Sequence, residues 1–301
     1  MPGRLALALV DESNNFQQLL RSDAVAAARK AGLEIETLFT GESLADHLGA
    51  LRRLIVAPER RPKALLVMAV RDHGLDKVVR EAAAAGVHFV FLNAVEDDLG
   101  AIRREFPAVS ISIVCPDEVE TGRVQGRQMR ALVPAGRRVL YIQGSPRSLT
   151  SRERTAGMQE ATAGAPFEVV LAGGDWNPAF ASRTVREWLR FAVGGRRPFD
   201  LVACQNDHMA GGALEALAAA AAESGPKQVA AIPVTGCDGA PDIGQRMVRD
   251  GRLLATVVLP RTAGPAVDEI AALLASGTRP APVITHAAAS FPPLSDLQPI
   301  A

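Results

Sequence analysis

The sequence has few aromatic residues, only three cysteines, no long apolar run and no net charge. Aromatic residues make up 4% of 301 residues, so a buried core must consist largely of Ala, Val, Leu and Ile. Lys plus Arg number 33 and Asp plus Glu also number 33. Proteins that bind nucleic acid usually carry a basic excess, because they neutralise phosphates. We therefore expect no nucleic-acid partner.

No stretch reaches the roughly 20 consecutive apolar residues that a membrane-spanning helix needs, so we expect no membrane insertion. The cysteines cannot all pair within one chain and show no Cys-x-x-Cys spacing. We interpret them as free, small apolar side chains at strand ends: Cys115, Cys204 and Cys237.

The N-terminal residues MPGRLALALV contain one Arg and then a strand-like apolar run, without a long apolar region followed by a cleavage site. If Met1 is the native start, we expect a cytoplasmic protein. If a signal peptide was removed and replaced by Met, the same sequence belongs in the periplasm or outside the cell. Both locations stay open at this point.

Enzyme motifs are missing as well. We find no GxGxxG after the first expected strand, no GxxxxGK[ST], and no GxSxG around Ser145. The histidines show no metal-binding spacing and are interpreted as isolated: His47, His73, His88, His208 and His286. We therefore expect a protein that is not an enzyme and has no metal or cofactor.

Short apolar runs alternate with amphipathic or Ala-rich stretches, a pattern typical of βαβ units with parallel sheets. In the first half the expected strands are Leu5–Val10, Glu34–Phe39, Ala64–Val70, His88–Leu92 and Val109–Val114. The expected helices are Phe16–Lys30, Leu44–Ala57 and Leu75–Ala85. Gly32 and Gly86 each follow a helix-like stretch, where a residue with positive φ can end a helix.

The pattern then restarts, which predicts a second, similar lobe. Its expected strands are Arg138–Gln143, Phe167–Leu171, Leu201–Cys204, Val229–Thr235 and Leu254–Val258. Its expected helices are Asp117–Leu132, Ser151–Ala163, Ala179–Ala192, Asp207–Glu223 and Ala240–Arg249, and a further helix is expected at Ala263–Ala275. The Pro-containing tail from Ser290 to Ala301 is expected to be extended and not helical.

Polar and aromatic residues follow the ends of many of these strands. In open parallel sheets, ligands bind beyond the carboxyl ends of the strands. The tips in question are Asp11–Phe16, Asn93–Glu96, Gly144–Pro146, Gly173–Trp176, Gln205–Asp207 and Gly236–Gly239. Amides and carboxylates can bond vicinal hydroxyls, and an aromatic ring can stack on a sugar. The tips therefore favour a neutral, hydroxyl-rich ligand.

Several motifs at these tips resemble those of type I periplasmic binding proteins, the ribose-binding-like sugar receptors of ABC transporters. The same core occurs in effector domains of lactose-repressor-type regulators. The motifs are SNNF at 13–16, IQGSPRSLTSRERTAGM at 142–158, GGDWNPAFA at 173–181, QNDHMAGGALEAL at 205–217, and VTGCDGAP with DGRLLATVV within 234–258. The resemblance extends over about the whole chain.

The resemblance implies two Rossmann-like, doubly wound parallel-sheet lobes joined by hinge strands, the periplasmic binding protein-like I fold. The implied lobes are residues 1–114 with 260–288, and residues 115–259 with 289–301. It also implies a set of ligand contacts, by analogy with the family: Asn14, Phe16, Asn93, Arg154, Trp176, Asn206 and Asp238. The sequence departs from the family pattern at three places. Asn93-Ala94 stands where sugar binders commonly have Asp-Arg, and Gln17 stands where ribose binders have a second Phe. Leu259 occupies the position of a Gln near the hinge.

The implied function is a monomeric receptor that closes by hinge bending on a sugar or polyol and delivers it to an ABC transporter permease. The alternative is a cytoplasmic, ligand-sensing regulatory domain with the same core and without a DNA-binding domain.

Ordinary structural roles compete with several of these assignments. Asp117 and Asp207 fit helix N-caps, and we favour a ligand contact for Asn206, which precedes Asp207. Arg154 follows Arg152 and Glu153, and such a run is also typical of a solvated helix surface.

Overall fold

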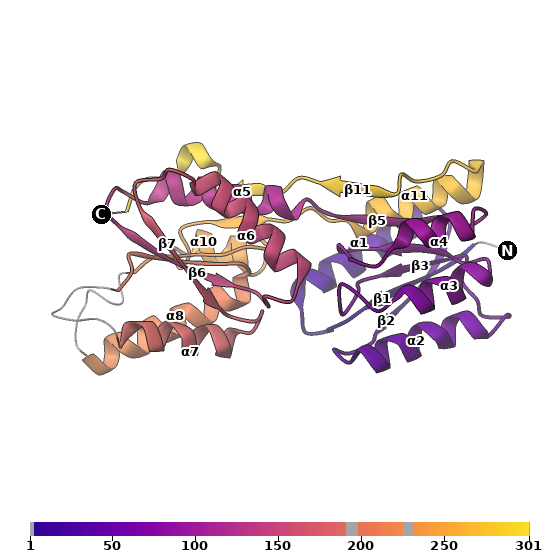
Figure 1. Cartoon of the computed structure of the whole chain (residues 1–301), viewed down its shortest axis with the longest axis horizontal. Coiled ribbons are helices and arrows are strands. Elements are labelled where there is room, and N and C mark those ends of the chain that lie inside the picture. The colour runs from indigo at the N-terminus through magenta and orange to yellow at the C-terminus, as the bar shows by residue number, and fades with distance from the viewer. Residues whose placement is uncertain (1–2, 191–197, 225–231, 301) are drawn as a thin grey trace. The chain divides into compact units, whose positions relative to one another are not determined.

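The computed structural model describes residues 3–190, 198–224 and 232–300, and it divides into two compact units. Unit 1 comprises Met1–Pro116 and Pro260–His286, and unit 2 comprises Asp117–Leu259 and Ala287–Ala301. The chain therefore passes between the units three times. From the sequence, these passages are expected after residues 114, 259 and 288. Each unit has a parallel sheet with helices on both faces, as expected for the α/β class (Figure 1).

Unit 1 contains a sheet of six strands, all paired in parallel, in the order β11-β5-β4-β3-β1-β2. The strands are β1 (Arg4–Leu9), β2 (Glu34–Phe39), β3 (Ala64–Val67), β4 (His88–Phe91), β5 (Ile111–Pro116) and β11 (Val283–His286). The helices are α1 (Asn15–Lys30), α2 (Leu44–Val56), α3 (Asp76–Ala84), α4 (Leu99–Glu105) and α11 (Ala263–Ser276).

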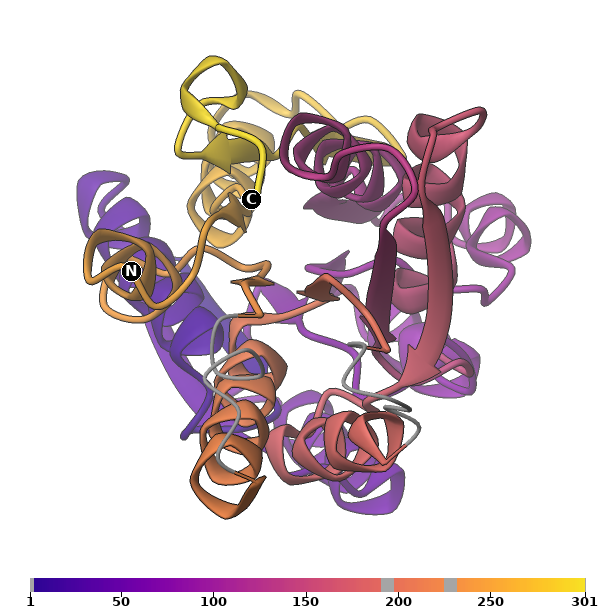
Figure 2. The same cartoon turned by 90° about the vertical axis from the view of Figure 1, so that its left-hand side faces the viewer.

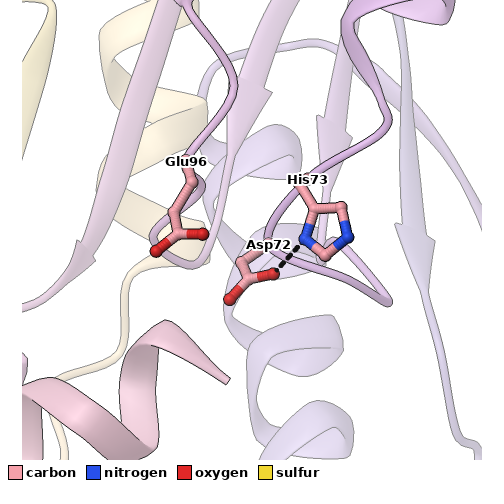
Figure 3. A group of neighbouring side chains, drawn as sticks. All are labelled: Asp72, His73 and Glu96. Carbon is pink, nitrogen blue, oxygen red and sulfur yellow. Dashed lines mark hydrogen bonds and ion pairs between the residues drawn. The ribbon is translucent and has the colours of Figure 1, made fainter. Parts of the chain in front are cut away.

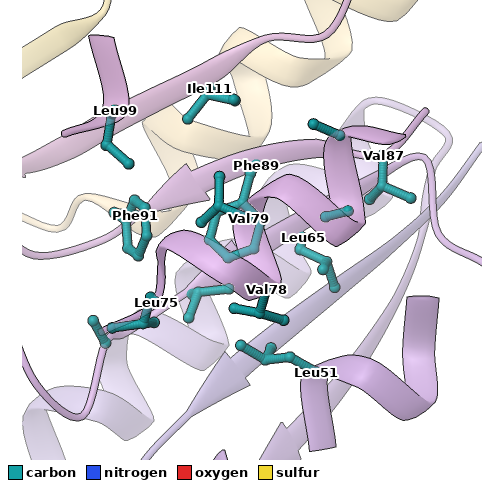
Figure 4. Close-up of a cluster of buried hydrophobic side chains, with 14 of the residues drawn as sticks. Leu51, Leu65, Leu75, Val78, Val79, Val87, Phe89, Phe91, Leu99 and Ile111 are labelled. Atoms are coloured by element: carbon teal, nitrogen blue, oxygen red, sulfur yellow. The ribbon is translucent and has the colours of Figure 1, made fainter. Parts of the chain in front are cut away.

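Alternate side chains of these strands enter two separate cores, one on each face of the sheet. Leu65, Phe89 and Phe91 pack with α2 and α3, where Val78 and Val79 cover the sheet (Figure 4). Leu66 and Val90 point to the other face and pack with α1 and α11. Because both faces are covered, the strands are apolar nearly throughout, as parallel strands in α/β proteins are.

Unit 2 contains a parallel sheet of four strands in the order β7-β6-β8-β9, and a separate antiparallel pair, β10-β12. The strands are β6 (Arg138–Gln143), β7 (Glu168–Gly173), β8 (Leu201–Cys204), β9 (Val234–Thr235), β10 (Thr256–Val258) and β12 (Ala289–Phe291). The helices are α5 (Glu118–Leu132), α6 (Leu149–Thr162), α7 (Pro178–Leu189), α8 (Asp207–Ser224), α10 (Gly244–Arg249) and the 3-10 helix η1 (Leu294–Asp296).

The helices of unit 2 cover its sheet in pairs. Helices α5 and α6 lie side by side on one face, and α7 and α8 lie side by side on the other (Figure 2). Val139 and Tyr141 of β6 enter the core with α5 and α6, while Leu140 and Ile142 enter the core with α7 and α8. The sheet therefore fixes where the loops after its strands can lie.

Most predicted elements are confirmed, and β2, β6 and β8 have the expected bounds. The elements α4, β11 and β12 were not predicted, because they are too short to show a clear hydrophobic periodicity. The tail is not wholly extended, because η1 forms one 3-10 turn in it. The expected strand Val229–Thr235 and helix Ala179–Ala192 extend beyond the described residues, and β9 and α7 are what the structure describes of them.

The predicted helix ends are confirmed at three positions. Gly32 and Gly86 have φ of 68° and 75°, the left-handed conformation that favours glycine after a helix. The Asp117 carboxylate accepts a hydrogen bond from the backbone N–H of Glu120, so this residue caps α5. Among the described residues, no helix has the length and apolar character needed to cross a membrane.

His47 is buried in unit 1 in a way that couples stability to pH. Its Nδ1 lies 2.6 Å from Thr40 Oγ1, and its Nε2 is buried without a hydrogen-bond partner among the described residues. A proton on Nε2 would thus be held away from water with no acceptor. Burial accordingly lowers the pKa of His47 from 6.5 to about 4.

We predict that this histidine makes unit 1 less stable as the pH falls. The folded chain resists protonation that the unfolded chain accepts below pH 6.5, so its contribution is complete above pH 6.5 and is lost towards pH 4. Between pH 7.5 and 5.0 the loss is about 2 kcal/mol, at 1.36 kcal/mol per pH unit. Urea unfolding of the wild type and of His47→Gln at both pH values measures it. Equal losses in the two proteins would contradict the prediction.

Candidate functional site

The carboxyl edge of the four-stranded sheet gathers the polar loops of unit 2. Because β6, β7, β8 and β9 are parallel, the residues after their last positions meet at one edge. These residues include Gly144, Trp176, Asn206 and Asp238, and Arg154 reaches the same edge from α6. Four predicted ligand contacts therefore lie together here: Arg154, Trp176, Asn206 and Asp238.

Arg154 is the centre of this edge, and it is buried. Its Nε donates to Glu118 Oε2 at 2.6 Å, and its Nη2 donates to Glu118 Oε1 at 3.3 Å. The two side chains are 4% and 5% exposed, which rules out the solvated-surface interpretation of Arg154. Burial opposes the charge of Arg154, but its neighbours, Glu118 foremost and Asp238 among them, together outweigh burial and hold the pKa of Arg154 above its ordinary value. The pair is a bidentate, buried ion pair.

Two more carboxylates lie beside this pair. Asp238 Oδ1 is 3.6 Å from Arg154 Nη1, and its side chain is 17% exposed. Asp207 is buried and accepts hydrogen bonds from the N–H of Gly239 at 2.8 Å and from the hydroxyl of Thr256 at 2.7 Å. Burial raises the pKa of both Asp207 and Asp238, because little water is left to solvate the charges.

Trp176 lies over Gly144 and beside the buried ion pair. The Arg154 guanidinium carbon is 5.6 Å from the centroid of the Trp176 ring, within the range of a cation–π contact. A Cβ atom at Gly144 would lie 2.1 Å from this ring, so only glycine at this position leaves room for the ring. The ring of Trp176 thus packs against residues of unit 2, and it is half-buried.

The backbone at this edge is strained at two predicted ligand contacts, Trp176 and Asp238, and at the neighbouring Asp175. Asp175, Trp176 and Asp238 have φ of 50°, 60° and 100°, in the region that non-glycine residues rarely adopt. Each such residue costs on the order of 1–3 kcal/mol and persists where the surrounding structure holds it. Such strain concentrates at functional sites, which supports a binding role for this edge.

Asn206 fills the capping role at α8 that we expected of Asp207. Asn206 Oδ1 accepts a hydrogen bond from the N–H of Met209 at 2.8 Å, so Asn206 caps α8. Asp207 is not the cap, because Gly239 and Thr256 hold its carboxylate. Either residue type can cap a helix, and only the tertiary contacts decide between them.

A buried polar network supports the edge, and we did not predict it. Gln205 Nε2 lies within 3.0–3.1 Å of the Tyr141 hydroxyl, Thr155 Oγ1 and the carbonyl of Ser151, and Gln205 Oε1 accepts from the N–H of Gly144 at 2.8 Å. Because Gln205 joins β6, α6 and the loop after β8, it fixes these elements relative to each other. In this sequence the residue looks like part of the motif around Asn206, and nothing local indicates its contacts.

The cysteines of this unit are free, as predicted, and both are buried. Burial raises the pKa of Cys204 and Cys237, so both stay protonated thiols and neither is an activated nucleophile. Cys237 Sγ lies 3.5 Å from Arg154 Nη1, which makes it part of the packing around the guanidinium.

In unit 1, Asn14 and Phe16 lie at the start of α1. Asn14 Oδ1 accepts a hydrogen bond from the N–H of Gln17 at 3.1 Å, so Asn14 is the N-cap of this helix. Phe16 is half-buried against the core that α1 and α11 cover. Gln17 Oε1 accepts from the N–H groups of Val10 and Asp11, and it therefore shapes the loop after β1.

Asn93 holds two loops of unit 1 together. Its Oδ1 accepts from the N–H of Ala69 at 2.7 Å, and its Nδ2 donates to the carbonyl of Ala69 at 3.1 Å. The amide thus joins the loops after β3 and β4. A ligand contact by Asn93 must use the remaining N–H and lone pair of the same amide.

Three side chains at the same edge of unit 1 could hold a metal ion. One ligand atom each from Asp72, His73 and Glu96 lies within 4.8 Å of the others (Figure 3). His73 Nδ1 is 2.7 Å from Asp72 Oδ1, so this histidine is not isolated in the structure, although its sequence neighbourhood indicates nothing of the kind. His73 and Glu96 are exposed, and such a group is common without an ion.

In chemical terms, unit 2 presents acceptors and an aromatic ring around an internally paired guanidinium. Asp238 and the remaining polar atoms of Asn206 can accept or donate hydrogen bonds to a hydroxyl, and Trp176 can cover an apolar ring face. No proton-transfer pair with a nucleophile arises among these described groups. The arrangement suits the binding of a ligand rich in hydroxyl groups.

We predict that Arg154→Met lowers the free energy of unfolding by about 3–5 kcal/mol, because it leaves Glu118 buried and unpaired. Arg138→Met is the matched control: it removes an ion pair with Glu168 whose partners are 46% and 58% exposed, and it should cost at most about 1 kcal/mol. Urea denaturation measures both. Similar losses in the two variants would show that the Arg154–Glu118 pair contributes no more than a surface pair.

We also predict that Gly144→Ala displaces the ring of Trp176 towards solvent, because the new methyl group takes the place of the ring. In a Trp188→Phe background, the fluorescence emission should shift to the red. Gly211→Ala on α8 is the control, since its Cβ would meet nothing within 4 Å. An unchanged spectrum in Gly144→Ala would contradict the described position of Trp176.

Comparison with known proteins places the chain in a family. The family model described as a periplasmic binding protein domain matches residues 5–278. The ribose import binding protein RbsB of Salmonella typhimurium is 28% identical over 277 residues, which are 91% of this chain and 86% of that protein.

Solved structures show the same fold. The periplasmic binding protein component of the arabinose ABC transporter from Shewanella sp. ANA-3 matches with a TM-score of 0.79 at 22% identity, covering 96% of this chain and 91% of that chain. The Caulobacter myo-inositol binding protein matches with a TM-score of 0.77 at 22% identity, covering 96% and 94%. The predicted fold and the resemblance seen in the sequence are both confirmed, and this chain belongs to the periplasmic binding protein family.

Proposed function

We propose that the chain is a solute-binding receptor that closes by hinge bending on a sugar or polyol and delivers it to an ABC transporter permease. The observation that carries this proposal is the carboxyl edge of unit 2. It combines a partly exposed carboxylate, an amide that caps α8 and a half-buried indole around a buried ion pair. Such a set binds hydroxyls and an apolar ring face.

The relatives support the same chemistry. One is named for ribose import, and solved structures with the same fold hold arabinofuranose and myo-inositol. We infer that unit 2 contributes Asp238, Trp176 and Asn206 to the ligand, with Arg154 holding Asp238 in place. Unit 1 contributes Asn14, Phe16 and Asn93, whose loops follow β1 and β4. The ligand then stabilises the closed state by contacts with both units.

We further propose that the protein binds its ligand without transforming it, acts as a monomer and works in the periplasm. A second candidate is a cytoplasmic, ligand-sensing domain with the same core. The three free, buried cysteines favour this candidate, because free thiols are typical of a reducing compartment. Fractionation of cells that express the native gene separates the two, since a receptor for import must be exported.

Calorimetric titration with pentoses, hexoses and polyols tests the binding function. We expect at least one of them to bind, and Asp238→Ala to weaken that binding at least about tenfold, since it removes a charged hydrogen-bond acceptor, an effect of about 1.4 kcal/mol or more. Asp250→Ala, an exposed acid at the end of α10, is the control and should bind as the wild type does.

The same sample tests closure, because the radius of gyration from X-ray scattering should fall when the ligand is added. Absence of any binder at millimolar concentration, or unchanged affinity in Asp238→Ala, would overturn the sugar assignment.

A further inference from the structure

Almost all N–H donors of the Arg154 guanidinium have partners inside unit 2. Besides its two hydrogen bonds to Glu118, its Nη1 donates to the carbonyl of Gln205 at 2.7 Å and contacts Cys237 Sγ at 3.5 Å. The same Nη1 faces Asp238 at 3.6 Å. An arginine has five N–H donors, and four of them are accounted for by these partners. Arg154 is therefore poorly placed to bind an anion from outside.

Glu118 is the residue that keeps Arg154 from binding an external anion. It is the first residue of α5 and 6% exposed, and both of its carboxylate oxygens contact Arg154. A carboxylate or phosphate on a ligand would have to displace a bidentate partner that is already desolvated. Glu118 thus neutralises the positive charge before any ligand arrives.

Two carboxylates at this edge share one cation. Glu118 and Asp238 both pair with Arg154, and the acidic side chain of Asp207 is buried near them. Asp207 is enclosed: a Cβ atom at Gly236 or Gly244 would lie 2.2 or 2.0 Å from its carboxylate oxygens. Burial raises the pKa of Asp207 and of Asp238, so it opposes the charged form of both carboxyl groups.

Asp238 is the charged group of this set that reaches the surface. Its side chain is 17% exposed, whereas Arg154 and Glu118 are 4% and 5% exposed. An approaching ligand therefore meets a carboxylate, and the guanidinium lies behind it. The electrostatic complement of such an edge is a cation that donates hydrogen bonds.

We propose, on the basis of the function proposed above, that the ligand carries a protonated amine, as an amino sugar or aminocyclitol does, and that its ammonium pairs with Asp238. Glu118 is the residue that sets this preference, because it holds Arg154 out of reach. An ammonium donates three hydrogen bonds, and bonds between charged groups are roughly twice as strong as neutral ones. Sugar acids and sugar phosphates meet Asp238 and are repelled.

Calorimetry at pH 7.5 with matched ligands tests the proposal. Each set keeps one sugar ring and changes one group: glucose, glucosamine and glucuronic acid, or galactose, galactosamine and galacturonic acid, with inositol and its amino derivative beside them. In the set that binds, we expect the amine to bind at least about tenfold more tightly than the hydroxyl compound, which corresponds to about 1.4 kcal/mol. We expect no heat from the acid.

Two variants assign the preference to residues. Asp238→Asn keeps the shape and one acceptor oxygen but removes the charge, so it should remove the advantage of the amine while neutral sugars still bind. Glu118→Gln frees Arg154, so it should reduce the advantage of the amine and allow the acid to bind. Asp250→Asn is the matched control, and it should leave all three affinities unchanged. Circular dichroism shows whether each variant folds, and if Glu118→Gln does not fold, Asp238→Asn decides alone.

The possible failures are distinct. Equal binding of the amine and the hydroxyl compound, or tightest binding of the acid, overturns this inference and leaves the proposed receptor function standing. An advantage of the amine that persists in Asp238→Asn also overturns it. Absence of binding by every sugar and polyol overturns the receptor function together with the inference.

Discussion

The buried ion pair between Arg154 and Glu118 organises the carboxyl edge of unit 2. Two desolvated charges can coexist there because the fork of hydrogen bonds between them is bidentate and the remaining donors find Gln205, Cys237 and Asp238. The cation also sits against Trp176, whose ring lies over Gly144. Trp176 and Asp238, two of the predicted ligand contacts of this unit, thus both contact one charge in α6.

The pair also connects elements that are distant in the sequence. Glu118 begins α5, Arg154 lies within α6, and Gln205 and Asp238 follow two different strands. A substitution of Glu118 at the start of α5 should therefore affect Asp238 after β9, because both side chains pair with Arg154 and not with each other. In unit 1, amides also hold the corresponding loops: Asn93 bonds Ala69, and Gln17 bonds the loop after β1.

The sequence predicted the fold well, because buried parallel strands are nearly continuous apolar runs: β2, β6 and β8 have the expected bounds. It predicted the site only in part. Arg154 was identified as a contact, but its burial was not, since the run of Arg152, Glu153 and Arg154 looks solvated. Glu118 was missed because an acid in the first turn of a helix is ordinary, and only the packing of α5 on α6 directs it at Arg154. Asp207 was expected to cap α8, but its partners, Gly239 and Thr256, lie far away in the chain, and Asn206 caps the helix instead.

The φ of 100° at Asp238 has a consequence for protein engineering. Glycine adopts this conformation without the steric penalty that a side chain incurs, so a redesign guided by thermal stability alone would choose glycine at position 238. The resulting protein would melt later and lack the carboxylate that faces the solvent at this edge. Stability and recognition are opposed at this residue, and a thermostable version of the chain has to gain its stability elsewhere.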